Sequence, residues 1–123
     1  MAQSLHDVSD PRNADICRDF DKAVNLEADE LELWLETAES LKVGWKGSDG
    51  NLRESVGHAS GRRIVKILRT PRDALTADDL GHMRKVIGFV RRHSAQRPEN
   101  TYTSRWRYSL MNWGHDPVKE EHR

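Results

Sequence analysis

Apolar residues recur at helical spacing in the first third of the chain. Ile16, Phe20 and Val24 follow Pro11 at intervals of four residues, which places them on one face of a helix. A proline suits the first helical position because the N–H that it lacks has no partner there. A second helix is predicted from about residue 28 to 41, with its apolar face at Leu31, Trp34, Leu35 and Ala38. Both helices lie within residues 11–41, and most of their charged positions are acidic.

Residues 42–57 break this periodicity. They contain four glycines and a Ser-Asp-Gly turn signal, with a few apolar residues between them. We predict a loop here, and it is the best candidate for a hinge between two helical halves.

Helical spacing returns within residues 58–95. Ile64, Ile67 and Leu68 face inward on a third helix, which is predicted from about residue 60 to 69. Thr76 opens a fourth helix, because Thr-Ala-Asp-Asp is an N-cap sequence whose first side chain accepts from a free backbone N–H. This helix runs to about Ser94 and has its core face at Leu80, Met83, Ile87 and Val90.

The last part of the chain, residues 101–116, is rich in aromatic residues. It predicts a short helix within residues 101–113, with Trp106, Leu110 and Trp113 on one face. Residues 1–10 and 117–123 are expected to be flexible tails. The pattern as a whole predicts an all-α fold, a single small domain of four main helices plus a short C-terminal helix.

The composition fits one folded domain in the cytoplasm. The chain has 123 residues, of which 36% are hydrophobic and 33% charged, and its net charge is zero. It holds no run near the roughly 20 apolar residues of a membrane span and no signal-peptide pattern at its start. Cys17 is the only cysteine, so no internal disulfide can form, as is usual in a reducing compartment.

The zero net charge hides an asymmetry. Residues 1–41 carry eleven acidic and three basic side chains, whereas residues 42–123 carry nine acidic and seventeen basic ones. Such a division is found where one half contacts nucleic acid. It also arises where the two halves attract each other within one domain, which needs no partner.

Little in the sequence indicates catalysis. Ser60 lies between glycines and could be a nucleophile with His58 as its base, but the strand that a nucleophile elbow requires is missing. We therefore favour Ser60 as the N-cap of the third helix. Cys17 lies among aspartates, which disfavour the reactive thiolate. We expect no catalytic residue and no small-molecule substrate.

The six histidines show no metal-site spacing. His82 and His93 share a helix face but lie about 16 Å apart at about 1.5 Å per residue, too far for one ion. We expect neither a metal nor a cofactor.

Two basic stripes are more informative. The third helix carries three cations within an arc of about 60°, and the fourth carries four within about 120°, each opposite the apolar face. Gly88 lies in the middle of the second stripe, where it costs about 1 kcal/mol relative to alanine. It indicates the approach of a phosphate backbone, the close packing of another helix, or simple sequence drift without a role. The candidate nucleic-acid-binding residues are Arg62, Lys66, Arg69, Arg84, Lys85, Arg91 and Arg92.

The aromatic segment could extend this surface. Arg97, Arg105 and Arg107 alternate there with Tyr102, Trp106 and Tyr108, whose rings could stack on bases. The alternative, which we favour, is that Trp106 and Trp113 close the core. The joint between Arg69 and Asp79 is nine residues long, which argues against a tight helix-turn-helix motif.

Four motifs carry a resemblance to a known family. They are residues 54–65 (ESVGHASGRRIV), 82–88 (HMRKVIG), 95–98 (AQRP) and 106–117 (WRYSLMNWGHDP). The chain resembles the small bacterial domain of unknown function 3140 family over about residues 15–118. The resemblance implies DNA binding, because members are often labelled DNA-binding proteins, but it implies no activity and no site residues.

The polar residues of these motifs allow two interpretations. They could form a buried polar junction that joins the tail to the third helix, or a pocket around His58, Ser60 and His115 could be a hydrolase site. We favour the junction, whose members would be Gly57, His58, Ser60, Arg62, Arg63, Asn112, His115 and Asp116.

The sequence thus favours a non-enzymatic nucleic-acid-binding protein, with DNA held through phosphate contacts from the basic two-helix face. The alternative is a protein-interaction module whose acidic N-terminal half binds a basic partner. The position of the acidic and basic surfaces separates the two hypotheses. If these surfaces face each other, DNA binding loses most of its support.

Overall fold

The computed structural model describes residues 11–47, 50 and 54–121, and these form an all-α fold without β-strands. The predicted tail at residues 1–10 lies outside this range. The α-helices of the described residues are α1 (Pro11–Ala23), α2 (Ala28–Leu35), α3 (Ala38–Lys42), α4 (Val56–Leu68), α5 (Ala77–Ser94), α6 (Arg105–Asn112) and α7 (Pro117–Glu121). A short 3₁₀ turn, η1 (Arg72–Ala74), lies between α4 and α5.

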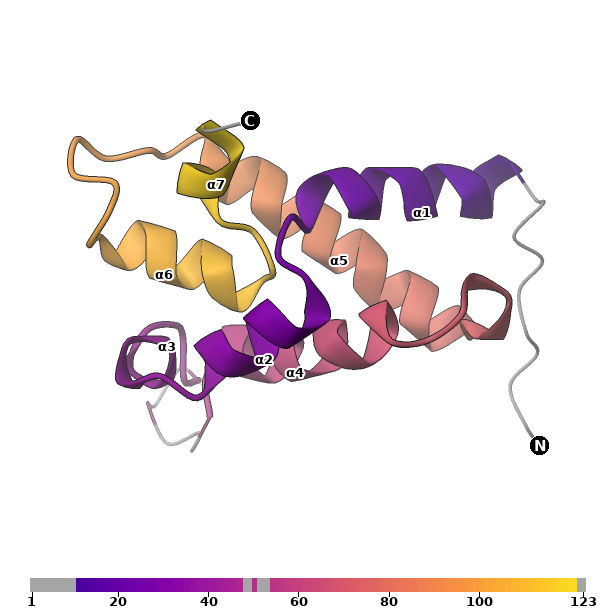
Figure 1. The fold of residues 1–123 in the computed structure, drawn as a ribbon, viewed down its shortest axis with the longest axis horizontal. Coiled ribbons are helices and arrows are strands. Elements are labelled where there is room, and N and C mark those ends of the chain that lie inside the picture. The colour runs from indigo at the N-terminus through magenta and orange to yellow at the C-terminus, as the bar shows by residue number, and fades with distance from the viewer. Residues whose placement is uncertain (1–10, 48–49, 51–53, 122–123) are drawn as a thin grey trace.

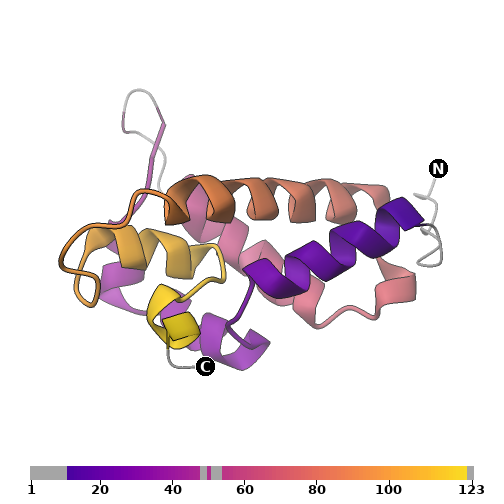
Figure 2. The ribbon, with the colours of Figure 1, turned by 90° about the horizontal axis from the view of Figure 1, so that it is seen from above.

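The helices pack mainly as two pairs. α1 packs across α5, and α2 packs along α4 (Figure 1). The view turned by 90° shows α5 along one side of the molecule, α2 and α7 on the opposite side, and α4 running obliquely between them (Figure 2). α6 lies beside α2 and contacts α2, α3, α4 and α5.

The core draws on every long helix. Phe20, Leu31, Ile64, Met83 and Leu110 are fully buried, and each comes from a different helix among α1, α2, α4, α5 and α6. The acidic half and the basic half of the chain therefore share one apolar core. No helix among the described residues is long and apolar enough to cross a membrane.

The single helix predicted over residues 28–41 is wrong in one respect, because it breaks into α2 and α3. The Thr37 hydroxyl donates to the carbonyl of Trp34 at the end of α2 and accepts from the backbone N–H of Ser40 at the start of α3. Thr37 thus ends one helix and caps the next.

The predicted start of the third helix is also wrong. α4 begins at Val56, inside the segment predicted as a loop, and Ser55 is its N-cap, accepting from the N–H of His58. Ser60 therefore lies within the helix. Gly57, which was placed in the predicted loop, and Gly61 both serve close packing within α4. A Cβ on Gly61 would come within 2.6 Å of the Asn112 carbonyl oxygen and of a Leu35 methyl group.

The fourth helix matches the prediction. α5 begins with a capping box, in which the Thr76 side chain accepts from the N–H of Asp79 and the Asp79 carboxylate accepts from the N–H of Thr76. α6 occupies only part of the predicted range 101–113.

The predicted C-terminal tail contains a helix over residues 117–121, so the domain extends beyond residue 116. The Asp116 carboxylate accepts from the N–H of Val118, and Pro117 takes the first helical position. The Val118 side chain is buried, and Lys119 pairs with Glu30 at 2.7 Å. Residues 122 and 123 lie outside the described range.

Candidate nucleic-acid interface

The acidic and basic halves of the chain are joined by ion pairs. Arg69 of α4 contacts two carboxylates of α2, Asp29 at 2.7 Å and Glu32 at 2.9 Å. Arg72 pairs with Asp21, and Arg91 lies 3.5 Å from Asp19. Much of the charge asymmetry is therefore satisfied inside the molecule, which weakens the DNA hypothesis for the basic residues in these pairs.

The basic stripe on α4 is largely neutralised. Arg62 holds Glu54 through two bonds of 2.8 and 2.6 Å, and this contact is the main cause that lowers the pKa of Glu54 from 4.5 to about 2. Arg69 is occupied by α2. Of the three predicted cations on this helix, Lys66 alone is exposed without an ion pair among the described residues.

The stripe on α5 is different. Arg84, Lys85 and Arg92 are exposed and have no ion pair within the described part of the chain, whereas Arg91 contacts Asp19. They lie within about one helical turn of Gly88, which borders a depression between α5 and α1. The predicted stripe thus survives as a basic face on one helix, and we call Arg84, Lys85 and Arg92 the α5 basic face.

Two glycines expose the backbone along this face. The atoms nearest to a Cβ on Gly88 all belong to the Arg92 guanidinium, and no described residue lies within 4 Å of a Cβ on Gly81. Close packing of another helix, one of the three explanations expected for Gly88, is therefore wrong for the described structure. Sequence drift and the approach of a phosphate backbone are both compatible with it, and the latter stays a prediction.

A depression of about 250 Å³ adjoins the face on the side of α4. It is lined by Arg63, Ala77, Asp78, Gly81, His82 and Lys85. Burial lowers the pKa of His82, and the nearby charges of Arg63 and Lys85 lower it further. Arg63 and His82 were missing from the predicted basic surface. The helical phase places Arg63 next to α5, but only the packing of α4 on α5 reveals this contact.

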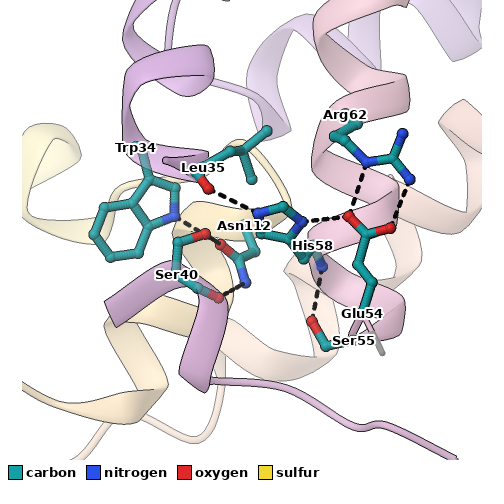
Figure 3. Close-up of polar contacts among 8 residues, drawn as sticks. All are labelled: Trp34, Leu35, Ser40, Glu54, Ser55, His58, Arg62 and Asn112. Carbon is teal, nitrogen blue, oxygen red and sulfur yellow. Dashed lines mark hydrogen bonds and ion pairs between the residues drawn. The ribbon is translucent and has the colours of Figure 1, made fainter. Parts of the chain in front are cut away.

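The three residues of the hydrolase hypothesis do not meet in one pocket. The buried Ser60 hydroxyl shares a 2.8 Å hydrogen bond with Nε2 of His82, not with His58. His115 donates from Nδ1 to the carbonyl of Ala23 at 2.7 Å. His58 contacts Glu54 through Nδ1 and donates from Nε2 to the Leu35 carbonyl at 2.7 Å (Figure 3). Each side chain joins a different pair of elements.

Asn112 forms the centre of a buried polar junction. Its side-chain oxygen accepts from Trp34 Nε1 at 2.8 Å and from the Ser40 hydroxyl at 2.5 Å, and its amide donates to the Ser40 carbonyl at 3.1 Å (Figure 3). The predicted junction between the tail and the third helix is therefore wrong in its connections, because the Asn112 side chain joins α6 to α2 and α3 and bonds to none of the other predicted members. Trp34 and Ser40 were not among its predicted members.

A second polar junction joins the C-terminal motif to the turn between α1 and α2. Asn25 and Asp116 exchange two hydrogen bonds of 2.9 and 2.8 Å, and the carbonyl of Gly114 accepts from the N–H groups of Asn25 and Leu26. Arg107 binds the Asp116 carboxylate through two nitrogens at 3.0 and 3.1 Å. Residues 113–117 (WGHDP) thus hold the C-terminal end of the chain against the turn between α1 and α2.

The large aromatic side chains also serve the core. Trp113 is buried and stacks on Phe89 at 4.3 Å between ring centroids, and Trp106 donates to the carbonyl of His93 at 2.6 Å. Tyr108 packs against Trp34 at 5.5 Å. The interpretation that the tryptophans close the core is confirmed, and Tyr102 is the large aromatic residue of this segment that stays exposed.

Among the described residues, no three His, Cys, Asp or Glu side chains are grouped so that they could hold a metal ion.

Comparison with curated proteins and with solved structures gave no match. A family model described as a protein of unknown function, DUF3140, matches residues 19–111. These residues include α5 and the α4–α5 depression. They also include Trp34 and Ser40, whereas Asn112 follows directly after the matched range. The match covers most of the chain, which therefore belongs to the DUF3140 family.

Proposed function

We propose that this protein binds nucleic acid, with duplex DNA as the first candidate, through the α5 basic face. The observation that supports this proposal is the state of its cations. Arg84, Lys85 and Arg92 are exposed and lack acidic partners among the described residues, whereas Arg62, Arg69 and Arg91 are paired. Phosphate contacts need cations that are free to exchange their counterions for the backbone.

The exposed backbone of α5 supports the same surface. Gly81 and Gly88 lie seven residues apart on one side of the helix, and each costs about 1 kcal/mol relative to alanine. No packing contact within the described structure requires either glycine. A helix without side chains at these positions lets a phosphate backbone approach between Arg84, Lys85 and Arg92.

The acidic half would make such binding weak and sensitive to salt. A surface depression holds Asp15 and Asp19 of α1 next to Arg84 and Arg91 of α5. These carboxylates reduce the positive potential at one edge of the basic face. With a net charge of zero over the chain, nonspecific attraction is also small.

The alternative, an acidic half that binds a basic protein, has less support. Five of its carboxylates already pair with the basic half of the same chain: Asp19, Asp21, Asp29, Glu30 and Glu32.

Fluorescence anisotropy of a labelled duplex of about 30 base pairs, titrated with protein at low and moderate salt, tests the proposal. We expect binding that weakens with salt and that is lost or strongly reduced in the triple variant R84A/K85A/R92A. The matched control is R62A/K66A/R69A, which removes the same charge from α4.

An equal loss in both triple variants would assign binding to net charge and would overturn the α5 face as the contact surface. The absence of binding at low salt would overturn nucleic-acid binding by the isolated chain. Circular dichroism of each variant shows whether the fold is retained.

A further inference from the structure

The depression between α4 and α5 brings together three nitrogen-bearing side chains from two helices. Arg63 reaches it from α4, and His82 and Lys85 reach it from the adjacent turns of α5. Gly81 contributes a stretch of wall without a side chain. The depression has a volume of about 250 Å³, is open to solvent, and exceeds what a tetrahedral oxyanion needs.

The electrostatics of the depression favour an anion. Apart from burial, the charges of Arg63 and Lys85 are the largest effects on the His82 ring, and both lower its pKa. The opposing effect of Asp79 is smaller. The potential at the ring is therefore positive, and it comes from two cations close enough to act on one bound group.

The contacts of His82 leave one nitrogen for a ligand. Nε2 is bonded to the Ser60 hydroxyl at 2.8 Å, and one ring face stacks on Trp113 with the centroids 6.2 Å apart. These two contacts fix the orientation of the imidazole. Nδ1 has no hydrogen-bond partner among the described residues, so it can donate to an oxyanion when Nε2 accepts from Ser60.

Arg63 is held loosely enough to turn toward a ligand. Its contact with Asp79 is long, at 3.4 Å, and the Asp79 carboxylate is already engaged by the N–H of Thr76 at 3.0 Å in the capping box. Asp79 therefore keeps its structural role if Arg63 leaves. Asp78 is the opposing charge, because it also lines the depression.

We propose that this depression is a phosphate-binding subsite, in which Arg63 and Lys85 supply the positive charge and His82 donates a hydrogen bond from Nδ1. The inference rests on the proposed function, since the phosphate in question is one of the nucleic-acid backbone that lies along the α5 basic face. A free phosphate would use the same chemistry, and the experiment separates these sources.

Nuclear magnetic resonance of the His82 ring protons, followed as a function of pH, gives a direct readout. The probes are the DNA duplex and sodium sulfate, a tetrahedral dianion that does not titrate in this range, with sodium chloride at matched ionic strength as the reference. An anion bound beside the ring raises the pKa of His82, and we expect a rise of about one pH unit, typical of an opposite charge within about 4–6 Å.

Three variants assign the response to the depression. R63A/K85A is expected to remove the rise, whereas K66A, which takes one charge from the exposed side of α4 outside the depression, is expected to leave it unchanged. D78N removes the opposing charge and is expected to tighten sulfate binding several-fold. A His82 response that survives in R63A/K85A would overturn the proposal.

The outcomes separate this inference from the proposed function. If the duplex binds but the pKa of His82 does not change, the α5 basic face is still supported as the contact surface and the phosphate subsite is overturned. A response to sulfate without duplex binding assigns the subsite to a free oxyanion and overturns nucleic-acid binding. A response to the duplex that exceeds the response to sulfate supports both.

Discussion

At the scale of single residues, the buried polar side chains do more for the fold than the exposed ions. Asn112 is 1% exposed and Ser40 is fully buried, and Trp34 directs its indole N–H at the same amide oxygen. A buried polar atom that loses its partner costs about 1–3 kcal/mol, whereas an exposed ion pair contributes about 0–1 kcal/mol. The α2–α3–α6 corner therefore depends on one amide.

The substitution N112A tests this dependence. It leaves the Trp34 N–H and the Ser40 hydroxyl without their acceptor, so we expect the free energy of unfolding to fall by about 2–4 kcal/mol. Urea denaturation followed by circular dichroism measures it. S40A removes only one donor and serves as the comparison, with an expected loss of about 1 kcal/mol. An N112A variant as stable as the parent would show that water replaces the amide.

His93 is the opposite case, because one of its polar atoms is buried without a hydrogen-bond partner among the described residues. That atom is Nε2, and the ring stacks on Phe89 at 5.0 Å. H93F keeps the stacking and removes the unpaired polar atom. We therefore expect H93F to be more stable by about 1 kcal/mol at neutral pH, measured by thermal unfolding.

The advantage of H93F is expected to grow in acid. Burial lowers the pKa of His93 below 6.5, so the unfolded chain takes up this proton at a higher pH than the folded chain. The stability of the parent therefore decreases as the pH falls below 6.5, until the folded-state pKa is passed. H93F lacks this component, and a stability difference that is constant between pH 7.5 and 5 would contradict the explanation. His82 behaves alike in both proteins and cancels in the comparison.

At the scale of helices, the glycines of α4 and α5 differ in how closely other residues pack against them. Gly57 and Gly61 in α4 are required by close neighbours, because a Cβ on Gly57 would come within 2.9 Å of Trp113 Nε1. Gly81 and Gly88 in α5 have no such neighbours except the flexible end of Arg92. The same residue type therefore marks helix packing in α4 and an open surface in α5.

Alanine substitutions test this difference. G81A and G88A are expected to stabilise the protein by about 0.5–1 kcal/mol each, the helix-propensity gain, since no described backbone obstructs the new methyl group. G61A is expected to destabilise it, because the methyl group would meet the Asn112 carbonyl and Leu35. If phosphates approach α5 between its cations, G81A/G88A also weakens duplex binding while it raises the melting temperature. Unchanged duplex binding would leave the open glycines without a role in recognition.

The helices that could be predicted from the sequence are those whose ends are marked locally. Pro11 fixes the start of α1, and the Thr76–Asp79 pair fixes the start of α5. The break at Thr37 and the start of α4 at Ser55 were missed, because a single hydroxyl acts there inside a segment whose apolar pattern gives no signal. The helix at Pro117 was missed because Val118 is buried, and Asp116 before it is held by Asn25, only when residues far apart in the sequence meet in the fold.

At the scale of the whole molecule, the sequence showed the charge asymmetry but could not show which charges pair. Arg62 and Arg84 look alike as members of basic stripes, yet Arg62 faces Glu54 and Arg84 has no ion pair among the described residues. The difference is local to each helix: Glu54 lies just before α4 and reaches Arg62, whereas the acids of α1 border Arg84 without an ion pair to it among the described residues. The sequence could therefore name the candidate cations on two helices, but only the structure shows that the unpaired ones lie mainly on α5.

The ion pairs between the two halves also set the strength of any binding. Asp15 and Asp19 of α1 border Arg84 and Arg91, so neutralising both carboxylates raises the positive potential along the edge of the α5 basic face. D15N/D19N is therefore expected to bind duplex DNA several-fold more tightly and with a steeper dependence on salt, because more cations are free to meet phosphates. Asp15 is largely exposed, and Asp19 is half-buried with a long 3.5 Å contact to Arg91, so the melting temperature should change little.

The matched control for this last prediction is D29N/E32Q. It changes the net charge by the same amount but releases Arg69 on α4, away from the α5 basic face. If the contact surface is on α5, anisotropy titrations give a clearly larger gain for D15N/D19N than for the control. Equal gains would mean that total charge alone governs the affinity. A larger gain for D29N/E32Q would move the interface to α4, because the arginine that it frees lies on the stripe that the fold otherwise neutralises.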